Sequence, residues 1–343
     1  MKMLKLAALL ALPLLFLPAG APRGQTAGNV VKLATLVPDG SVWDKILRSL
    51  GSEWTQTTQG RVSLRIYAGG VAGDEPDIVR KMRIGQLHAG VLTINGLAGI
   101  DESFRLFAIP VFFDSYPEMF HVLKKMEPTL KSRLEAKGFV LLNWGHGGWV
   151  HFFTRAPVQT VDELKKLKIF VWAGDDPGVQ IWKENGFNPV ALAATDILPA
   201  LQTGMIDALP SPPLAANLLQ WFRRAPNMAD IGLGPLAGGL LITKQAWSRI
   251  SEADRAAILI ACRKAERRLE LEIPRQDSMS VIEMKRRGLN VVHIRPENAV
   301  AWRAAAETFG SYMRDKVVPR DVFDMATRER DAYRRQNPTR GGR

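Results

Sequence analysis

The spacing of apolar residues along the chain alternates between that of strands and that of helices. Val31, Leu33 and Thr35 are separated by single small or polar residues, which is the period of a strand. The next apolar positions lie on one helical face: Trp43, Ile46, Leu47, Leu50 and Trp54. The alternation continues to about residue 94 and predicts a β-α-β-α-β unit, the building block of a mostly parallel sheet.

The rest of the chain continues this pattern after a glycine-rich break. Residues 145–148 read Gly-His-Gly-Gly, where the chain can pass from one lobe to another. A further strand is expected at residues 168–172. Ser251 begins a long amphipathic helix, and Pro274 is expected to kink or end it. The chain is long enough for two lobes of ordinary domain size.

Residues 1–21 have the features of a secretory signal peptide. A short basic start precedes the apolar run 6–17, and Ala19 and Ala21 fit the small-residue rule for cleavage, which is expected near Ala21. The run is shorter than the roughly 20 apolar residues that span a bilayer, although an uncleaved membrane anchor is the alternative. The single cysteine, Cys262, excludes an internal disulfide and favours the bacterial periplasm.

The chain has a formal net charge of +12, and part of the excess lies at its C-terminal end. Residues 328–343 contain six arginines and two acidic residues, which predicts a basic, flexible tail. A basic excess can indicate nucleic acid or an anionic membrane as partner. No nucleic-acid-binding motif accompanies it, so a solvated basic surface without a nucleic-acid partner is the favoured interpretation.

No catalytic motif stands out in the sequence. There is no nucleophile elbow and no phosphate-binding loop. Cys262 lies on the apolar stripe of the long helix, which favours packing over a nucleophilic role. His146 and His151 have no carboxylate or thiolate in their segment to complete a metal site. We expect no catalytic residue, no metal and no cofactor, although many active sites leave no local signature.

Three ordered motifs carry a resemblance to a known family. Residues 154–158 and 161–169 resemble the signature P-I-x-T-x-x-D-L-x-G-L-K-I-R-V. Residues 200–207 resemble A-L-Q-T-G-x-V-D-G, and residues 109–113 resemble L-P-F-L-F. With weaker similarity from about residue 31 to about residue 319, the chain resembles the substrate-binding proteins of tripartite ATP-independent periplasmic (TRAP) transporters, the DctP family.

The resemblance implies an α/β fold of the two-lobed periplasmic binding protein type, with hinge strands and a long helix crossing both lobes. Lobe I is expected at residues 28–148 and about 235–272, and lobe II at residues 149–234 and about 273–327. The family implies a periplasmic receptor that passes a small-molecule ligand to two integral membrane subunits and is not an enzyme. We also expect a monomer.

The sequence departs from the family at two positions that bind anions. The family signature carries an arginine that clamps the ligand's carboxylate, and Phe170 occupies this position. A second family arginine lies eight residues before the signature proline, and Trp149 occupies that position. Arginine offers a planar fork of donors to a carboxylate, and an aromatic ring offers apolar area instead. These departures predict an apolar or aromatic ligand rather than a simple dicarboxylate.

Six side chains are the candidate ligand-binding residues: Trp149, Phe170, Trp172, Thr93, Ser211 and Trp43. Phe170 and Trp172 have the same parity on their strand and face one side. Thr93 and Ser211 align roughly with polar ligand contacts of the family. The alternative is that Phe170 and Trp149 pack in a lobe's core, and that Trp43 belongs to the buried face of the first helix.

Three functions are compatible with these features. The first is a transport receptor for a largely apolar ligand. The second is a periplasmic ligand-sensing or lipid-shuttling module without a transport role. The third is an enzyme on the same scaffold, because a fold does not fix a function. Neighbouring genes for two permease subunits would separate the first from the second, and turnover of a bound compound would support the third.

Overall fold

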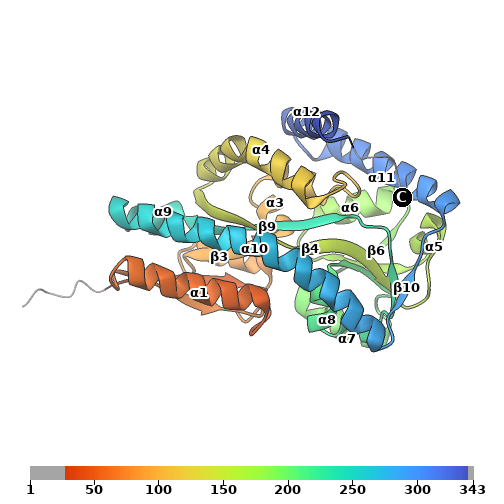
Figure 1. Cartoon of the computed structure of the whole chain (residues 1–343), viewed down its shortest axis with the longest axis horizontal. Helices are drawn as coiled ribbons and strands as arrows, with labels where there is room; N and C mark the ends of the chain where they lie inside the picture. The colour runs from red at the N-terminus through yellow and green to blue at the C-terminus, as the bar shows by residue number, and fades with distance from the viewer. Residues whose placement is uncertain (1–27, 339–343) are drawn as a thin grey trace, which may run out of the picture.

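The computed structural model describes residues 28–338, which form two α/β lobes joined by long strands and a long helix (Figure 1). This arrangement confirms the predicted fold class. The predicted signal peptide, residues 1–21, lies outside the described residues. Within residues 28–338, no helix combines the length and the apolar character needed to cross a membrane.

Lobe I begins with the β-α-β-α-β unit that the apolar spacing predicted. Strand β1 (Asn29–Thr35) pairs in parallel with β2 (Val62–Tyr67) and with β3 (Ala89–Thr93). The connecting helices are α1 (Val42–Thr57) and α2 (Glu75–Arg83). Because parallel strands end at one edge of a sheet, the C-terminal ends of β1 and β3 lie together, where ligands commonly bind in such sheets.

Strand β4 (Phe139–Thr154) passes from one lobe to the other. It pairs antiparallel with β9 (Gly234–Thr243), and β9 also pairs with β3. Further along, β4 pairs with β7 (Ala208–Ser211) of lobe II. Its register against β9 shifts between His146 and Trp149. The crossing therefore coincides with the glycine-rich break predicted from the sequence.

Lobe II is built on β4, β7, β5 (Lys168–Trp172) and β6 (Asn188–Leu192), in that order across the sheet. Two short strands, β8 (Asn227–Ala229) and β10 (Asn290–Val292), pair with each other, and β8 also pairs with β4. The helices of lobe II are α5 (Val161–Lys165), α6 (Asp176–Glu184), η2 (Ala194–Asp196), α7 (Ile197–Thr203), α8 (Pro213–Leu218) and η3 (Trp221–Arg223). The remaining helices of lobe I are α3 (Ile94–Ala98), η1 (Glu102–Ala108), α4 (Tyr116–Ala136) and α9 (Lys244–Ser248).

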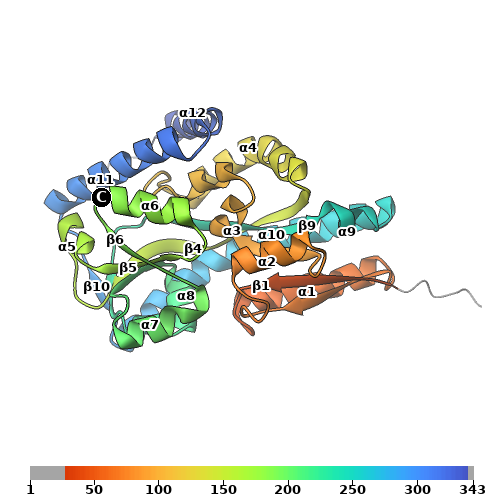
Figure 2. The ribbon, with the colours of Figure 1, turned by 180° about the vertical axis from the view of Figure 1, so that it is seen from behind.

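The long helix α10 (Glu252–Arg286) runs along both lobes (Figures 1 and 2). Pro274 was expected to kink or end this helix, and the helix does not end there but continues to Arg286. Proline removes one helical hydrogen bond, and packing on both sides of it holds the helix together. Cys262 is fully buried in the core of lobe I, and Met284 is fully buried in the core of lobe II.

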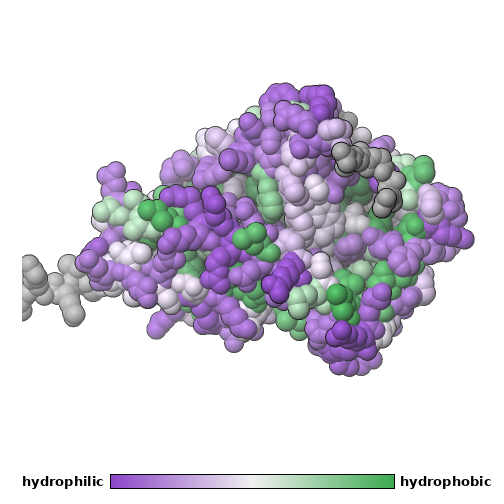
Figure 3. Space-filling view, viewed as in Figure 1, coloured by the Kyte–Doolittle hydropathy of each residue, from purple (hydrophilic) through white to green (hydrophobic). Residues whose placement is uncertain are grey.

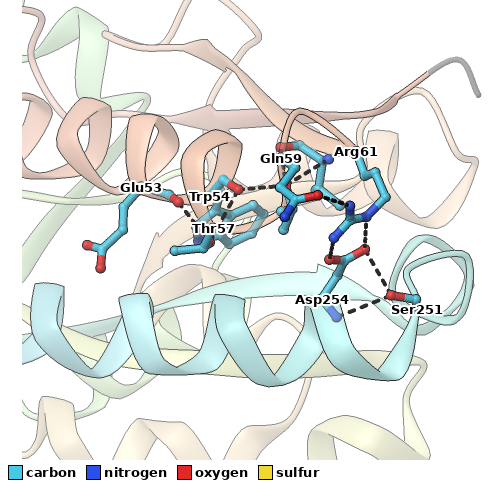
Figure 4. A network of polar contacts seen from close by, with 9 residues as sticks. Glu53, Trp54, Thr57, Gln59, Arg61, Ser251 and Asp254 are labelled. Carbon is cyan, nitrogen blue, oxygen red and sulfur yellow. Dashed lines mark hydrogen bonds and ion pairs between the residues drawn. The ribbon is translucent and has the colours of Figure 1, made fainter. Parts of the chain in front are cut away.

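The first turn of α10 is anchored to the loop that follows α1 (Figure 4). The Arg61 guanidinium donates to both carboxylate oxygens of Asp254, with N–O distances of 2.7 and 3.0 Å. The Ser251 hydroxyl donates to Asp254 at 2.8 Å and also caps the helix by accepting from the Asp254 N–H. These contacts attach the N-terminal end of the crossing helix to lobe I.

The last two helices correct two predictions about the C-terminal part. Helix α11 (Pro296–Lys316) leads to α12 (Arg320–Gln336), so residues 328–336 are helical and not a flexible tail. Arg334 pairs with Glu118 at 2.5 Å and with Asp114 at 2.8 Å, which fixes the end of α12 beside the start of α4. Lobe II was expected to extend to residue 327, whereas α12 packs against α4 and η1 of lobe I.

The face that carries α10 is largely hydrophilic, and its hydrophobic residues form several separate patches (Figure 3). Most basic residues of α10 face solvent, among them Arg263, Arg267 and Arg275. Such a surface is consistent with the solvated basic face that the sequence favoured.

Candidate ligand-binding cleft

A cavity of about 700 Å³ lies between the two lobes. Lobe I contributes parts of α1, β3 and β4 to its wall, and lobe II contributes parts of β5, β7 and α6. Most of the side chains on the wall are apolar. The volume lies within the range of about 300–1,000 Å³ typical of small-molecule sites.

An aromatic wall made by β5 faces this cavity. Phe170 and Trp172 both lie on it, with ring centroids 5.5 Å apart and planes at 65°. The sequence predicted that these two rings share one side, and the geometry agrees. Phe170 is only 2% exposed and also belongs to the core of lobe II. The alternative prediction, that Phe170 packs in the core of a lobe, therefore also holds.

Trp43 faces the cavity from the opposite lobe. It lies in the first turn of α1, which is capped by Ser41, and its neighbours Ile46 and Leu47 point into the core. The Trp43 indole N–H donates to the carbonyl of His146 on β4 at 3.3 Å. This bond fixes the ring on the cavity wall, outside the buried face of the helix.

Trp149 does not lie on the cavity wall, although the resemblance to the family had suggested it as a ligand-binding residue. Its ring packs edge-on against Tyr116, with centroids 5.1 Å apart. Its backbone N–H donates to Asp277 of α10 at 2.9 Å. The register shift in β4 just before Trp149 changes the facing of the residues that follow it, and sequence spacing could not show this.

Thr93 lines the cavity, but its hydroxyl already has a partner. The Thr93 hydroxyl and backbone N–H donate to the carboxylate of Glu75 at 2.7 and 2.6 Å, and Gly96 N–H donates to it at 2.7 Å. Burial raises the pKa of Glu75 to about 7 and outweighs these hydrogen bonds. Sequence analysis missed Glu75, which lies on the wall beside Thr93.

The polar groups on the β4 and β7 side of the cavity are buried. Ser211 lies on the wall, is 1% exposed and donates its hydroxyl to the carbonyl of Pro212 at 3.0 Å. His146 is also buried, and its ring packs against those of Tyr116 and Phe120, with centroids 5.0 and 5.4 Å away. Burial lowers the pKa of His146 to about 4, so this side chain is neutral at pH 7.

An ion pair that sequence reasoning missed connects the lobes at the cavity. Arg105 of η1 and Asp175 at the start of α6 both line it, and their side chains are joined by an N–O distance of 2.5 Å. Arg105 is also paired with Glu102, three residues earlier in η1. Only the spacing of Glu102 and Arg105 was visible in the sequence, and it does not indicate which way the guanidinium points.

Cys262, the cysteine of the described part of the chain, is buried and unpaired. Burial raises the pKa of the Cys262 thiol to about 12, which leaves it without nucleophilic character at pH 7. Within residues 28–338, no group of three or more His, Cys, Asp and Glu side chains is placed to hold a metal ion.

A comparison with protein families identifies the family to which this two-lobed chain belongs. The family model of DctP, the bacterial extracellular solute-binding proteins of family 7, matches residues 33–315. The chain belongs to this family. The resemblance drawn from the three sequence motifs is thereby confirmed, and the DctP fold explains the position of the cleft between two lobes.

Relatives of this DctP chain are distant in sequence. A solute-binding protein of Chromohalobacter salexigens is 27% identical over 229 residues, which cover 64% of this chain and 66% of that protein. The 2,3-diketo-L-gulonate-binding periplasmic protein YiaO of Escherichia coli is 23% identical and covers 77% of this chain and 79% of its own length. Another relative, YiiZ of Salmonella typhimurium, is matched over only 50% of its length.

Solved structures share the fold at still lower identity. A TRAP periplasmic solute-binding protein of Chromohalobacter salexigens with bound D-glucuronate has a TM-score of 0.80 at 22% identity, and the match covers 88% of this chain and 99% of that one. The sugar acid binding protein of Advenella mimigardefordensis in complex with galactonate has a TM-score of 0.82 at 16% identity, covering 89% and 98%. At these identities the likeness shows the two-lobed fold.

Proposed function

We propose that this DctP protein is a periplasmic receptor that delivers a largely apolar or aromatic ligand to the two membrane subunits of a TRAP transporter. Family membership supports the receptor role, and the cavity between the lobes supplies a place for a small molecule. The protein acts by binding and release and not by catalysis. We also propose that it works as a monomer.

The observation that carries the ligand class is the lack of a free cation on the cavity wall. Within residues 28–338, Arg105 is the only arginine or lysine that lines the cavity, and two carboxylates already bind it. A charged hydrogen bond contributes about 1.5–3 kcal/mol, and a buried carboxylate without one is strongly disfavoured. Phe170, Trp172 and Trp43 offer ring surface instead, and each fully buried ring contributes several kcal/mol, at about 25 cal/mol per Å² of apolar area.

The known ligands of relatives point to a different ligand class. YiaO is named for 2,3-diketo-L-gulonate, and the neighbouring structures hold D-glucuronate and galactonate, all of them acids. This chain departs from the family signature at the residue that clamps such acids, because Phe170 stands in place of the arginine. We therefore assign it a separate specificity within the same receptor fold.

The ligand can be identified by native mass spectrometry of protein purified from its own host, followed by denaturing extraction. We expect a retained compound with a large apolar or aromatic part. Trp172→Ala should then weaken its affinity at least tenfold, because a central aromatic anchor is lost. Trp247→Ala is the matched control, since Trp247 of α9 lies away from the cavity. Retention of succinate or D-glucuronate by the wild-type protein would contradict the assigned ligand class.

A further inference from the structure

The cavity wall carries more carboxyl groups than cations. Within residues 28–338, the carboxyl groups of Asp39, Glu75 and Asp175 line it, and Arg105 is the only arginine or lysine that does so. The Arg105 side chain is 8% exposed, and that of Asp175 is 18% exposed, so water screens their interaction only weakly. Asp39 is 78% exposed and pairs with Arg48, whereas Asp175 is the carboxylate of the wall that pairs with Arg105.

Asp175 is held firmly in its place beside Arg105. It is the residue that caps α6, and one of its carboxylate oxygens accepts from the Gly178 N–H at 3.1 Å. The same oxygen lies 2.5 Å from the Arg105 guanidinium of the other lobe. Glu102 binds the Nε side of that guanidinium. Arg105 therefore points its donors at two carboxylates of the protein itself.

We propose that Asp175 determines the charge of the ligand: it fills with its own carboxylate the anion site that Arg105 would otherwise present to the cavity. This inference rests on the proposed receptor function and explains how a DctP cleft with an arginine on its wall favours uncharged ligands. A ligand carboxylate would have to displace Asp175 from Arg105 or lie beside it as a like charge, and both raise the free energy of binding.

Asp175→Asn tests this assignment with little risk to folding. Asparagine caps a helix as well as aspartate does, so α6 keeps its start. The substitution raises the charge of the Arg105, Glu102 and Asp175 group by one and replaces a charged partner of the guanidinium by a neutral amide, which a ligand carboxylate can displace more easily. Asp176→Asn is the matched control, because the neighbouring Asp176 is exposed, does not line the cavity and carries the same charge.

The probes are indole-3-acetate and indole-3-acetamide, which share a ring and a shape but differ by one charge. Binding is measured by calorimetry at pH 7.5 for both variants and the wild-type protein. We expect the wild-type protein to bind the amide at least tenfold more tightly than the acid. In Asp175→Asn the affinity for the acid should rise at least tenfold, while that for the amide changes less than threefold. Asp176→Asn should behave like the wild-type protein.

The double variant Arg105→Gln with Asp175→Asn separates a freed arginine from a general loosening of the lobes. This double variant should bind the acid no more tightly than the wild-type protein does. An acid affinity that is unchanged in Asp175→Asn, or undetectable in both proteins, overturns the role of Asp175, and so does a gain that survives in the double variant. The proposed ligand class fails separately, if the wild-type protein already binds the acid as tightly as the amide.

Discussion

Glu75 is a carboxyl group that the folded protein keeps away from water. Burial raises its pKa to about 7, against about 4.3 in an unfolded chain. The folded state therefore binds the proton more tightly than the unfolded state. The contribution of Glu75 to stability is complete below about pH 4 and is lost as the pH rises through about 7.

We expect Glu75→Gln to remove this part of the pH dependence. Between pH 4.5 and pH 8, the free energy of unfolding of the wild-type protein should fall relative to that of the variant, by on the order of 3 kcal/mol. Urea unfolding at both pH values measures the difference. Glu307→Gln, at an exposed position of α11, serves as control and should parallel the wild-type protein. If the free energy of unfolding changes equally with pH in Glu75→Gln and in the wild-type protein, this carboxyl titrates normally.

At the level of single residues, the sequence predicted which way a side chain faces where the alternation along a regular strand determines it. Phe170 and Trp172 share a face because they are two residues apart on a regular strand. Trp149 was instead placed by its spacing from the signature proline of the family, and this spacing does not take account of the register shift in β4 that precedes it. Glu75, Arg105 and Asp175 could not be found from sequence, because each acquires its role from partners distant in the chain or from the way its side chain points.

The crossing of β4 and α10 depends on a close approach that only glycine permits. Gly148 has a φ of +121°, and a Cβ at this position would lie 2.8 Å from the Asp277 carboxyl group and from Pro212. Asp277 accepts from the N–H groups of Trp149 and Leu214 at 2.9 and 2.8 Å. It thereby connects β4 and α8 to the crossing helix.

We predict that Gly148→Ala destabilises the protein more than the same change at another glycine with positive φ. Gly138→Ala is the matched control, because Gly138 has a φ of +88° and no atom lies within 4 Å of the position that its Cβ would take. The control should cost about 1–2 kcal/mol for backbone strain. Gly148→Ala should cost at least about 2 kcal/mol more, because Asp277 must move and leave two buried N–H groups unpaired. If chemical denaturation shows the same loss of stability for both variants, the backbone around Gly148 can adapt to a Cβ without losing the contacts of Asp277.

Whole elements were predicted well where local spacing determines them and less well where tertiary contacts do. The first five elements follow from alternating apolar periods. The continuation of α10 past Pro274 depends on packing against both lobes, and the helical end of the chain depends on the pairing of Arg334 with Glu118 and Asp114. A single sequence does not show such contacts.

At the scale of the whole molecule, polar contacts beside the cavity connect the two lobes. Asp74 caps α2 through one carboxylate oxygen, which accepts from the Glu75 N–H at 2.8 Å. Its other oxygen accepts from the Ala194 N–H of lobe II at 2.9 Å. The resemblance to the family predicted two lobes joined by hinge strands, but not the residues that hold them in contact.

Asp74→Ser separates these two roles, because serine retains the helix cap and has only one side-chain oxygen. Without the bond to Ala194, which contributes about 0.5–1.5 kcal/mol, the ligand-free protein should spend more time with its lobes apart. Small-angle X-ray scattering should then give a larger radius of gyration for Asp74→Ser than for the wild-type protein. Asp77→Ser is the matched control, since Asp77 lies on the same helix and pairs only within lobe I, with Arg80 at 2.8 Å. If all three proteins have the same radius, the closed arrangement does not depend on Asp74, and the ion pair of Arg105 with Asp175 becomes the principal polar contact between the lobes at the cavity.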